Sequence, residues 1–479
     1  MTFHSEPFLA IPSYMSRIMY PEEFVEEWEY ALASEFGKDG VPAQYAPGHP
    51  MEWGSELRKI SSEPSSSKSL AFTPDYKFIA VSHDKQIHIH EAESFDQVHT
   101  LEGHQAVVTD LEFAPSVSGT EGYTLLSFSH ATGRRAVLPQ AVIWNLGRDG
   151  RSTSVAQAVS VEEVHEAAKI AAKTAVDHLG HRGDFVIDSE KFEDLTRHFE
   201  EPLLSRRLET LMNNQHVIYK SIPGFGSNCF SPDGQYLVLL KAKEGKCLKQ
   251  QAVVYDVAHR DTRFELATHM DSVMWVGFSP DNKTIATVSW DEYAHLYSAE
   301  DGRLLHKIGP TGGQNWTGAF SHNSQYFAFT HVGEVRVHRV QDGALVSSNK
   351  DSKGWSRSIA WSPDDKRLLC ASRVVILTNP LTGETEQKWA LKFKSSRLSS
   401  WAEAGNTLWL DKEKFAFATG EGAIEIYDLE KNRKWRWAPK KGDYWRPGFW
   451  SKEILIDESR KRVVSVCGQK DVRVWKLDD

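Results

Sequence analysis

The sequence predicts an all-β fold, built as a ring of repeated small units. Eight segments of the 479-residue chain share one pattern, in which an apolar anchor is followed by a polar turn and then by a hydrophobic strand. Four anchors precede a Pro-Asp turn, as Phe278 does, and an apolar residue usually returns seven positions after the anchor, as at Ile285. The anchors are Phe72, Phe113, Phe230, Phe278, Phe320, Trp361, Trp409 and Ile456. A unit of three or four short strands cannot bury both faces alone, so neighbouring copies must share a core.

Within each unit the apolar residues alternate in twos, which is the period of a β-strand. Residues 78–81 and 86–90 form two predicted strands joined by a turn at His83 and Asp84, and residues 302–308 form the predicted outer strand of another copy. Four-stranded units about 40 residues apart are typical of propeller blades. We therefore expect a β-propeller.

The two ends of the repeat region predict how the ring closes. The last copy supplies only three strands, at residues 454–456, 463–466 and 472–475, and residues 57–60 can supply its missing outer strand. Joining the two ends in one blade leaves no free strand edge. Counted in this way the ring has eight blades. Seven is the alternative, and the irregular copy at 396–439 would then be left out.

Two features of the repeats point to a known family. A histidine stands nine residues before two of the anchors, His104 before Phe113 and His269 before Phe278. The predicted third strands end in pairs that begin with an aromatic residue: Trp144-Asn145, Tyr255-Asp256, Tyr297-Ser298, Tyr427-Asp428 and Trp475-Lys476. Over residues 56–479 the chain resembles the WD-repeat β-propellers, in which Gly-His precedes the first strand and Trp-Asp ends the third.

The resemblance also bears on a Ser-His-Asp set in the fourth copy. His269, Ser289, Asp291 and Tyr297 resemble the buried hydrogen-bond network of that family rather than a catalytic triad. The literal Trp-Asp pair, Trp290-Asp291, falls in the turn between the second and third strands, where the family's turn aspartate would be. We therefore expect the four side chains to be buried close together as scaffold.

Residues 1–55 form a predicted N-terminal extension ahead of the propeller at 56–479. An amphipathic helix is expected to begin at Pro21 and to end at Gly37, because proline favours the first helical position and glycine the end of a helix. Its stripe of Phe and Trp is expected to pack on the rim of the ring, with docking of a partner as the alternative.

Residues 147–215 form a predicted helical insertion between the third and outer strands of blade 2. Ser160 opens a capping box for a helix that should stop at Gly180. A second helix should begin near Ser189, and Pro202 is expected to break or restart it.

Composition argues against several classes of function. Lys and Arg number 56 against 65 Asp and Glu, which gives a net charge of −9, so we expect no nucleic-acid partner. There is no run of 18 apolar residues and no early apolar leader, so we expect a protein of the cytoplasm or nucleus without a membrane partner. The histidines of the insertion, His165, His178, His181 and His198, lack the spacing of a ligand pair, so neither a metal site nor a cofactor is expected.

Aromatic residues and arginines gather where the chain leads into the first strands of several blades. In a propeller these segments line one mouth of the central channel, and Trp, Tyr and Arg dominate binding hot spots. The candidate binding residues are Trp275, Trp316, Trp355, Arg357, Tyr444, Trp445 and Arg446. The alternative for each Trp is a place between blades as core filler.

Two functions fit this pattern. The first is a non-catalytic interaction scaffold that binds a peptide or protein partner at the aromatic-rich channel mouth. The second is an enzyme that holds a small apolar or aromatic metabolite in the channel. The sequence has no nucleophile elbow, phosphate loop, metal cluster or dinucleotide fingerprint, so no catalytic residue is assigned. Acid–base or shape-driven chemistry would then depend on Arg357, Asp443 or Arg446. We favour the scaffold.

Overall fold

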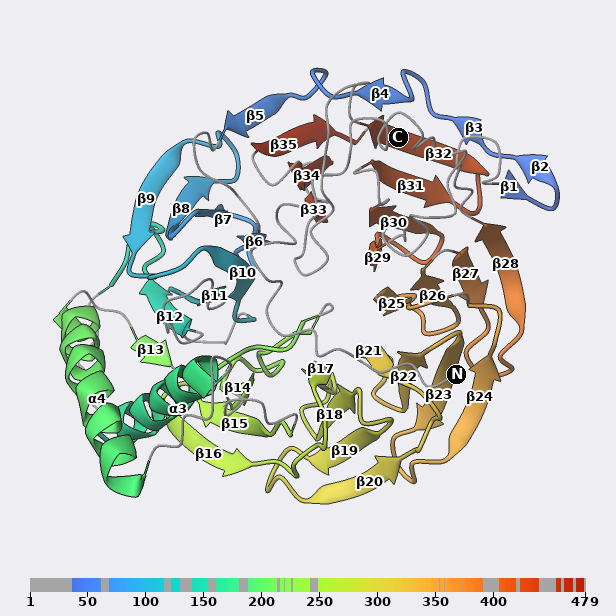
Figure 1. The fold of residues 1–479 in the computed structure, drawn as a ribbon. Coiled ribbons are helices and arrows are strands. Elements are labelled where there is room, and N and C mark those ends of the chain that lie inside the picture. The colour runs from blue at the N-terminus through green and yellow to red at the C-terminus, as the bar shows by residue number, and fades with distance from the viewer. Residues whose placement is uncertain are drawn as a thin grey trace.

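A computed structural model gives the arrangement of the chain (Figure 1). The residues that it describes are 37–61, 69–115, 122–129, 140–153, 161–180, 188–212, 216–218, 220–224, 227–241, 249–352, 354–356, 358–372, 374–390, 405–418, 423–438, 454–457, 461–467 and 471–477. These residues form eight blades around a common axis. The predicted all-β propeller is therefore confirmed.

Blades 1 to 3 begin the ring. Blade 1 consists of β6 (Leu70–Phe72), β7 (Phe78–His83), β8 (Gln86–Glu91) and β9 (Gln97–Glu102). Blade 2 consists of β10 (Val108–Phe113), β11 (Tyr123–Ser129), β12 (Gln140–Leu146) and β13 (His216–Ile218). Blade 3 has β14 (Tyr236–Leu240), β15 (Ala252–Asp256) and β16 (Asp261–Glu265). Single bridges from Ser221 and Phe230 to β14 take the place of its inner strand.

Blades 4 to 6 are regular four-stranded sheets. Blade 4 consists of β17 (Val273–Phe278), β18 (Thr284–Ser289), β19 (Ala294–Ser298) and β20 (Leu304–Ile308). Blade 5 consists of β21 (Asn315–Phe320), β22 (Tyr326–His331), β23 (Glu334–Arg339) and β24 (Leu345–Asn349). Blade 6 consists of β25 (Ser358–Trp361), β26 (Leu368–Ala371), β27 (Val374–Thr378) and β28 (Thr385–Ala390).

Blade 8 joins the two ends of the ring. It consists of β33 (Ile454–Asp457), β34 (Arg462–Cys467), β35 (Asp471–Lys476) and, from the other end of the chain, β5 (Arg58–Ser61). Ile60 lies opposite Val472 and Arg58 opposite Val474, in antiparallel register. The predicted closure is confirmed.

The irregular copy forms blade 7, with β29 (Gly405–Trp409), β30 (Lys414–Ala418), β31 (Ile424–Asp428) and β32 (Arg433–Ala438). Because this copy is a blade of its own, the alternative of a seven-bladed ring is wrong.

Residues 37–55 belong to the outer edge of the ring, which the sequence did not predict. After a small hairpin of β1 (Gly37–Lys38) and β2 (Val41–Pro42), strands β3 (Gln44–Tyr45) and β4 (Met51–Glu52) pair in parallel with β32. Trp389 Nε1 of blade 6 donates to the Gly37 carbonyl oxygen at 3.0 Å. Extended chain here satisfies edge groups of β32 that would otherwise lack partners. The helix predicted to begin at Pro21 lies outside the described residues, apart from its last position.

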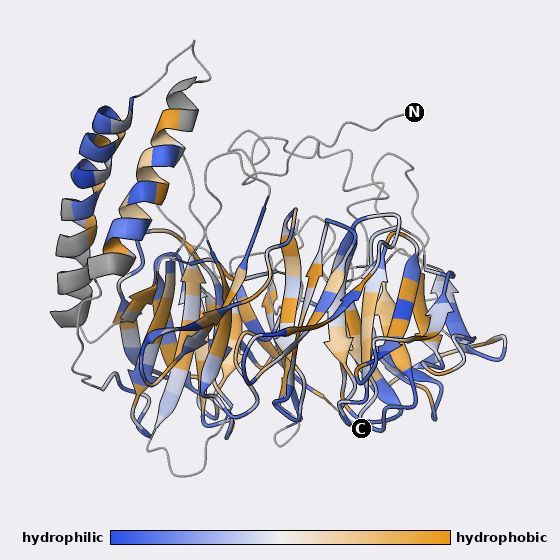
Figure 2. Ribbon diagram, turned by 90° about the horizontal axis from the view of Figure 1, so that it is seen from below, coloured by the Kyte–Doolittle hydropathy of each residue, from blue (hydrophilic) through white to orange (hydrophobic). Residues whose placement is uncertain are grey.

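The insertion in blade 2 forms two helices, α3 (Val161–Gly180) and α4 (Ser189–Met212), as predicted. Figure 2 shows that they stand beside the ring and project past one end of it. The expected stop at Gly180 and start at Ser189 are confirmed, but α4 continues through Pro202. An ion pair between His165 of α3 and Glu200 of α4 lies within one turn of that proline. Packing between the two helices therefore outweighs the break that proline favours.

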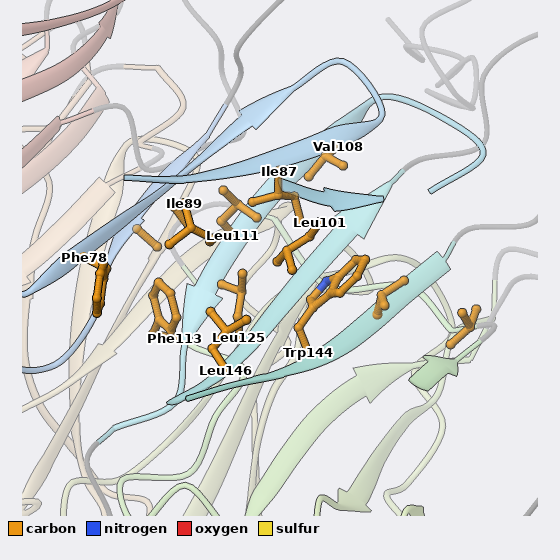
Figure 3. Packing of buried hydrophobic residues seen from close by; sticks show 14 of the residues in the cluster. Phe78, Ile87, Ile89, Leu101, Val108, Leu111, Phe113, Leu125, Trp144 and Leu146 are labelled. Atoms are coloured by element: carbon orange, nitrogen blue, oxygen red, sulfur yellow. The ribbon is translucent and has the colours of Figure 1, made fainter. Parts of the chain in front are cut away.

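Each blade buries its two faces against its neighbours. Between blades 1 and 2 the core is made by Phe78, Ile87, Ile89 and Leu101 on one side and by Val108, Leu111, Phe113, Leu125, Trp144 and Leu146 on the other (Figure 3). The sequence anchor Phe113 lies in this shared core, which confirms that the repeat cannot stand alone.

Blade 4 holds the buried hydrogen-bond network that the sequence led us to expect, with one change. His269 Nδ1 lies 2.9 Å from Asp291 Oδ2, and His269 Nε2 lies 2.7 Å from Thr287 Oγ1. Thr287 thus takes the role expected of Ser289, which instead accepts from the Asp291 backbone N–H at 3.2 Å. Positions 287 and 289 point to the same face of β18, so the sequence period could not separate them. Tyr297 is buried beside them and donates from its hydroxyl to the Ala267 carbonyl oxygen.

Candidate functional site at the upper end of the ring

The two ends of the ring differ in which strand termini they carry. Strand β35 runs parallel to the inner strand β33 and leads to the C-terminus, which lies at the lower end in Figure 2. The inner strands therefore begin at the upper end. The turns between the second and third strands of each blade return to this same end, because neighbouring strands are antiparallel.

Four large apolar side chains meet at the upper end of blades 4 to 6. Trp316 of β21 stacks on Trp355, with ring centroids 5.2 Å apart and an interplanar angle of 27°. Trp290, from the turn between β18 and β19, meets Trp316 edge to face at 5.2 Å. Met274 of β17 completes the group. We call Met274, Trp290, Trp316 and Trp355 the mouth cluster.

Irregular strand starts position these side chains. The pairing of β17 with β18 shifts register between Val273 and Trp275, and the pairing of β21 with β22 shifts between Asn315 and Gly318. A bulge of this kind turns a side chain away from the regular alternation of the strand. Met274 and Trp316 lie within these two shifts, so both leave the core between blades and join the mouth cluster.

Backbone hydrogen bonds tie the loops of the mouth cluster together across blades. The Trp290 N–H donates to the Ser272 carbonyl oxygen at 2.9 Å, within blade 4. The Thr311 N–H donates to the Glu292 carbonyl oxygen at 3.0 Å and links blade 4 to the loop before blade 5. The Gly333 N–H donates to the Gly354 carbonyl oxygen at 3.2 Å and links blade 5 to the loop before blade 6. These hydrogen bonds hold the loops around Trp290 and Trp355 in place.

Two exposed apolar residues flank the mouth cluster. Met270 is 61% exposed and follows His269 in the loop before blade 4. Its backbone N–H donates to Asp291 Oδ2 at 2.9 Å, which holds it beside the turn that carries Trp290. Val332 is 47% exposed, in the turn between β22 and β23. Large exposed hydrophobic residues that gather at one place commonly mark a binding surface.

The structure brings together two of the predicted binding residues and separates a third. Trp316 and Trp355 are in direct contact, as expected for residues that share a mouth. Trp275 packs between blades 4 and 5, over Phe327, and is 5% exposed. Trp316 is buried too, at 6% exposed, so the two indoles differ in their neighbours and not in their exposure. A Cβ atom on Gly318 would approach the Trp275 ring to 3.0 Å, so glycine makes room for this indole. For Trp275 the alternative of core filler is the correct one.

The other predicted binding residues, Arg357, Tyr444, Trp445 and Arg446, lie outside the described residues, as does Asp443. Sequence reasoning missed Met274 and Trp290. Trp290 was assigned to the turn that supports the buried network, although that turn returns to the end where the inner strands begin. The antiparallel order of the strands could have placed it beside Trp316.

Comparison with known families decides the kind of propeller. The family model of the WD domain, G-beta repeat, matches residues 261–298, which include β16 to β19. This match lies within an eight-bladed ring that closes by joining its two chain ends. The chain is a WD-repeat β-propeller.

A comparison with solved structures bears only on the fold of this WD-repeat propeller. A crystal structure of the computationally designed Ika8 protein covers 88% of this chain and 100% of its own, with a TM-score of 0.53 and 13% identity. At that identity the likeness concerns the fold. No curated protein matches at the level of sequence. WD-repeat propellers generally serve as scaffolds for protein interactions.

Two further findings concern the described part of this WD-repeat propeller. Among the residues described, no group of three or more His, Cys, Asp or Glu side chains is arranged to hold a metal ion. Neither α3 nor any other described helix is long and apolar enough to cross a membrane.

A separate pocket of about 340 Å³ opens between blades 3 and 4, where their first and second strands are joined, and so at the lower end. Arg263 covers the ring of Tyr236 there, 4.5 Å from its centroid. Asp233, Lys283 and Glu300 also line this pocket, so its wall is mixed in charge. It is remote from the mouth cluster, because the two occupy opposite ends of the strands.

Proposed function

We propose that this WD-repeat propeller is a non-catalytic interaction scaffold that binds a peptide segment of a partner protein on the mouth cluster. The observation that carries the proposal is the convergence of Trp290, Trp316, Trp355 and Met274 from three neighbouring blades. Met270 and Val332 expose apolar side chains at the same end of the ring.

The chemistry of these side chains favours a peptide with an apolar or aromatic side chain. Indoles offer large rigid faces and supply much of the binding free energy at protein interfaces. Methionine side chains adapt their shape to what they contact, so the exposed Met270 can fit around an inserted side chain. Met274 is 6% exposed and packs with Trp316, so it supports the indoles from within the ring. The hydrogen bonds that fix the loops reduce the conformational entropy that these loops would otherwise lose on binding.

The test is a selection of peptides from a displayed library against the full chain, followed by affinity measurements. Trp290→Ala combined with Trp355→Ala should weaken binding of the selected peptides at least about tenfold, as expected for hot-spot residues. The matched control replaces two exposed leucines on outer strands, Leu304→Ala and Leu345→Ala, which are 38% and 56% exposed. The control should bind as the wild type does.

Thermal melts of both double variants show whether the ring stays folded. Peptides that bind the tryptophan variant and the wild type equally well would rule out the mouth cluster as the docking surface. Selected peptides that depend on the two leucines would place the interface on the outer strands instead.

A further inference from the structure

The first described residue of the chain is attached to blade 6. The Gly37 carbonyl oxygen accepts a hydrogen bond from Trp389 Nε1 of β28 at 3.0 Å. Lys38 Nζ donates to the Leu429 carbonyl oxygen of blade 7 at 3.4 Å. Residues 1–36 therefore join the ring at the outer edge of blade 6, where it meets blade 7.

The strands of blade 6 set the distance from this attachment to the mouth cluster. One row of directly opposed residues crosses the four strands: Trp389, Val375, Ala371 and Ser358. Three strand spacings of about 4.8 Å separate the two ends of this row, which gives about 14 Å. Trp355 comes three residues before Ser358 and lies at most about 11 Å beyond it. With the length of the Trp389 side chain added, the path from Gly37 to Trp355 is on the order of 30 Å.

Residues 7–20 have the composition of an apolar peptide with one positive charge. Most of them are apolar or aromatic: Phe8, Leu9, Ala10, Ile11, Tyr14, Met15, Ile18, Met19 and Tyr20. Pro7 and Pro12 favour extended backbone in themselves and in the residues before them, and Arg17 is the single charged residue. A segment this apolar needs a surface that covers it, because contiguous exposed apolar side chains promote aggregation.

The mouth cluster offers such a segment accessible apolar side chains with acidic residues beside them. Met270 is 61% exposed, and Trp290 and Trp355 are half-buried. Asp271 directly follows Met270, and Glu292 lies in the turn that carries Trp290. Both acidic residues are partly exposed, and neither is in an ion pair with another described residue. A positive charge on an apolar peptide therefore finds a partner of opposite sign here.

We propose that residues 7–20 of this same chain occupy the mouth cluster when no partner is bound. This step rests on the proposed function, because it names a peptide that the same surface holds. Residues 21–36, as the helix that the sequence predicts, span about 24 Å, and residues 7–20 add about 46 Å when extended. Together these lengths exceed the path of about 30 Å from Gly37 to Trp355.

The order of the blades gives the direction of the segment. The chain arrives from blade 6, so residues 18–20 pass Trp355 first and the residues before them lead toward blade 4. Trp355 and Trp290 each lie 5.2 Å from Trp316, so about three extended residues cross the mouth cluster. Arg17 then reaches the acidic side chains of Asp271 and Glu292. A partner peptide must displace the segment, which lowers the affinity that the full chain shows for it.

Methyl NMR of the full chain tests the contact, because Met15 and Met19 lie within the segment and an indole shifts the signal of a methyl group that lies over its face. In the wild type both signals should differ from those of a synthetic peptide of residues 7–20 in solution. Trp290→Ala with Trp355→Ala should move both signals to the positions of the free peptide.

The leucine double variant, Leu304→Ala with Leu345→Ala, is the control and should leave both signals where the wild type has them. Thermal melts check that both double variants stay folded. Wild-type signals of Met15 and Met19 that match the free peptide, or that the tryptophan variant leaves in place, would overturn the proposal. Signals that move to the free-peptide positions on dilution would place the segment on a second copy of the chain and overturn docking within one chain.

Affinity measurements test the charge contact in the same full chain. Arg17→Glu weakens the competing segment, so it should raise the affinity of a library-selected peptide about 3- to 10-fold. Arg17→Lys keeps the charge and should bind that peptide as the wild type does. Equal affinities in the two variants would contradict the contact with Asp271 and Glu292.

Addition of the selected peptide separates failure of this step from failure of the proposed function. Displacement predicts that the Met15 and Met19 signals move to the positions of the free peptide. A selected peptide that needs Trp290 and Trp355 but leaves both signals in place would overturn self-docking and leave the proposed function standing. Selected peptides that bind the tryptophan variant as well as the wild type, with both methionine signals unmoved by that variant, would overturn both.

Discussion

Replacing Asp291 with alanine tests whether the network in blade 4 is scaffold. The side chain of Asp291 is 7% exposed and accepts from three groups: His269 Nδ1 at 2.9 Å, the Met270 N–H at 2.9 Å and the Tyr293 N–H at 3.1 Å. Burial alone would raise the pKa of Asp291. The hydrogen bond and the charge of His269, together with the hydrogen bonds from the backbone, outweigh burial and lower this pKa from 3.8 to about 2. The ionised carboxylate is thus favoured in the folded state.

The size of the effect follows from that shift in pKa. A difference of roughly 2 pKa units corresponds to roughly 2–3 kcal/mol of folding free energy near neutral pH. Leaving one buried hydrogen-bond partner unsatisfied costs about 1–3 kcal/mol, which is the same range. Asp291→Ala should therefore lower the free energy of unfolding by about 1–3 kcal/mol.

Urea denaturation of the full chain at pH 7 measures this loss. Glu300→Ala, at an exposed position of the same blade, is the control and should change stability little. Because the pKa of Asp291 is depressed, its stabilisation is present above about pH 4 and disappears as the pH falls toward 2. The gap between wild type and Asp291→Ala should narrow over that range. Unchanged stability together with lost peptide binding would refute a scaffold role and make Asp291 part of a site.

Three further predictions concern closure, acid and thiol reactivity. Deleting residues 470–479 removes β35, which leaves β34 and β5 without their shared partner, so the ring should unfold as one unit at lower temperature; a melt that matches the full chain would contradict closure. His295 is 4% exposed, and burial and then the charge of His269 lower its pKa to about 3. The contribution of His295 to the free energy of unfolding is complete above pH 6.5 and falls as the pH drops toward 3, by about 2 kcal/mol at pH 5. The urea midpoint should therefore fall less from pH 7 to 5 in His295→Gln than in the wild type, and an equal fall in both would contradict this. Burial raises the pKa of the Cys370 thiol to about 11, so mass spectrometry should find Cys370 unmodified by iodoacetamide at pH 8 in the folded protein and modified in urea; rapid labelling of the native chain would show that this strand opens.

The repeat made the ring predictable from sequence. Anchors such as Phe113 and Phe278 recur because every blade must share its core with a neighbour, and the missing strand of the last copy could be found at Ile60. The helices of the insertion were also predictable, since Gly180 and Ser189 are local signals that need no tertiary context.

Features that depend on tertiary contacts were not predictable. The pairing of residues 44–45 and 51–52 with β32 joins short polar segments with no strand period of their own. Trp275 and Trp316 look alike in sequence, at the starts of neighbouring inner strands, yet one is core and the other meets Trp355. Bulges decide between them, and a bulge of one residue leaves no clear mark in a single sequence.

The most direct test of peptide binding at the mouth cluster is methyl NMR of the chain labelled at its seven methionines. Met270 and Met274 lie at the candidate site, whereas Met51 packs against blade 7 on the outer edge of the ring. Adding a library-selected peptide should shift the methyl signals of Met270 and Met274 and leave that of Met51 in place. A peptide that binds yet leaves both Met270 and Met274 unchanged would contradict the proposed site.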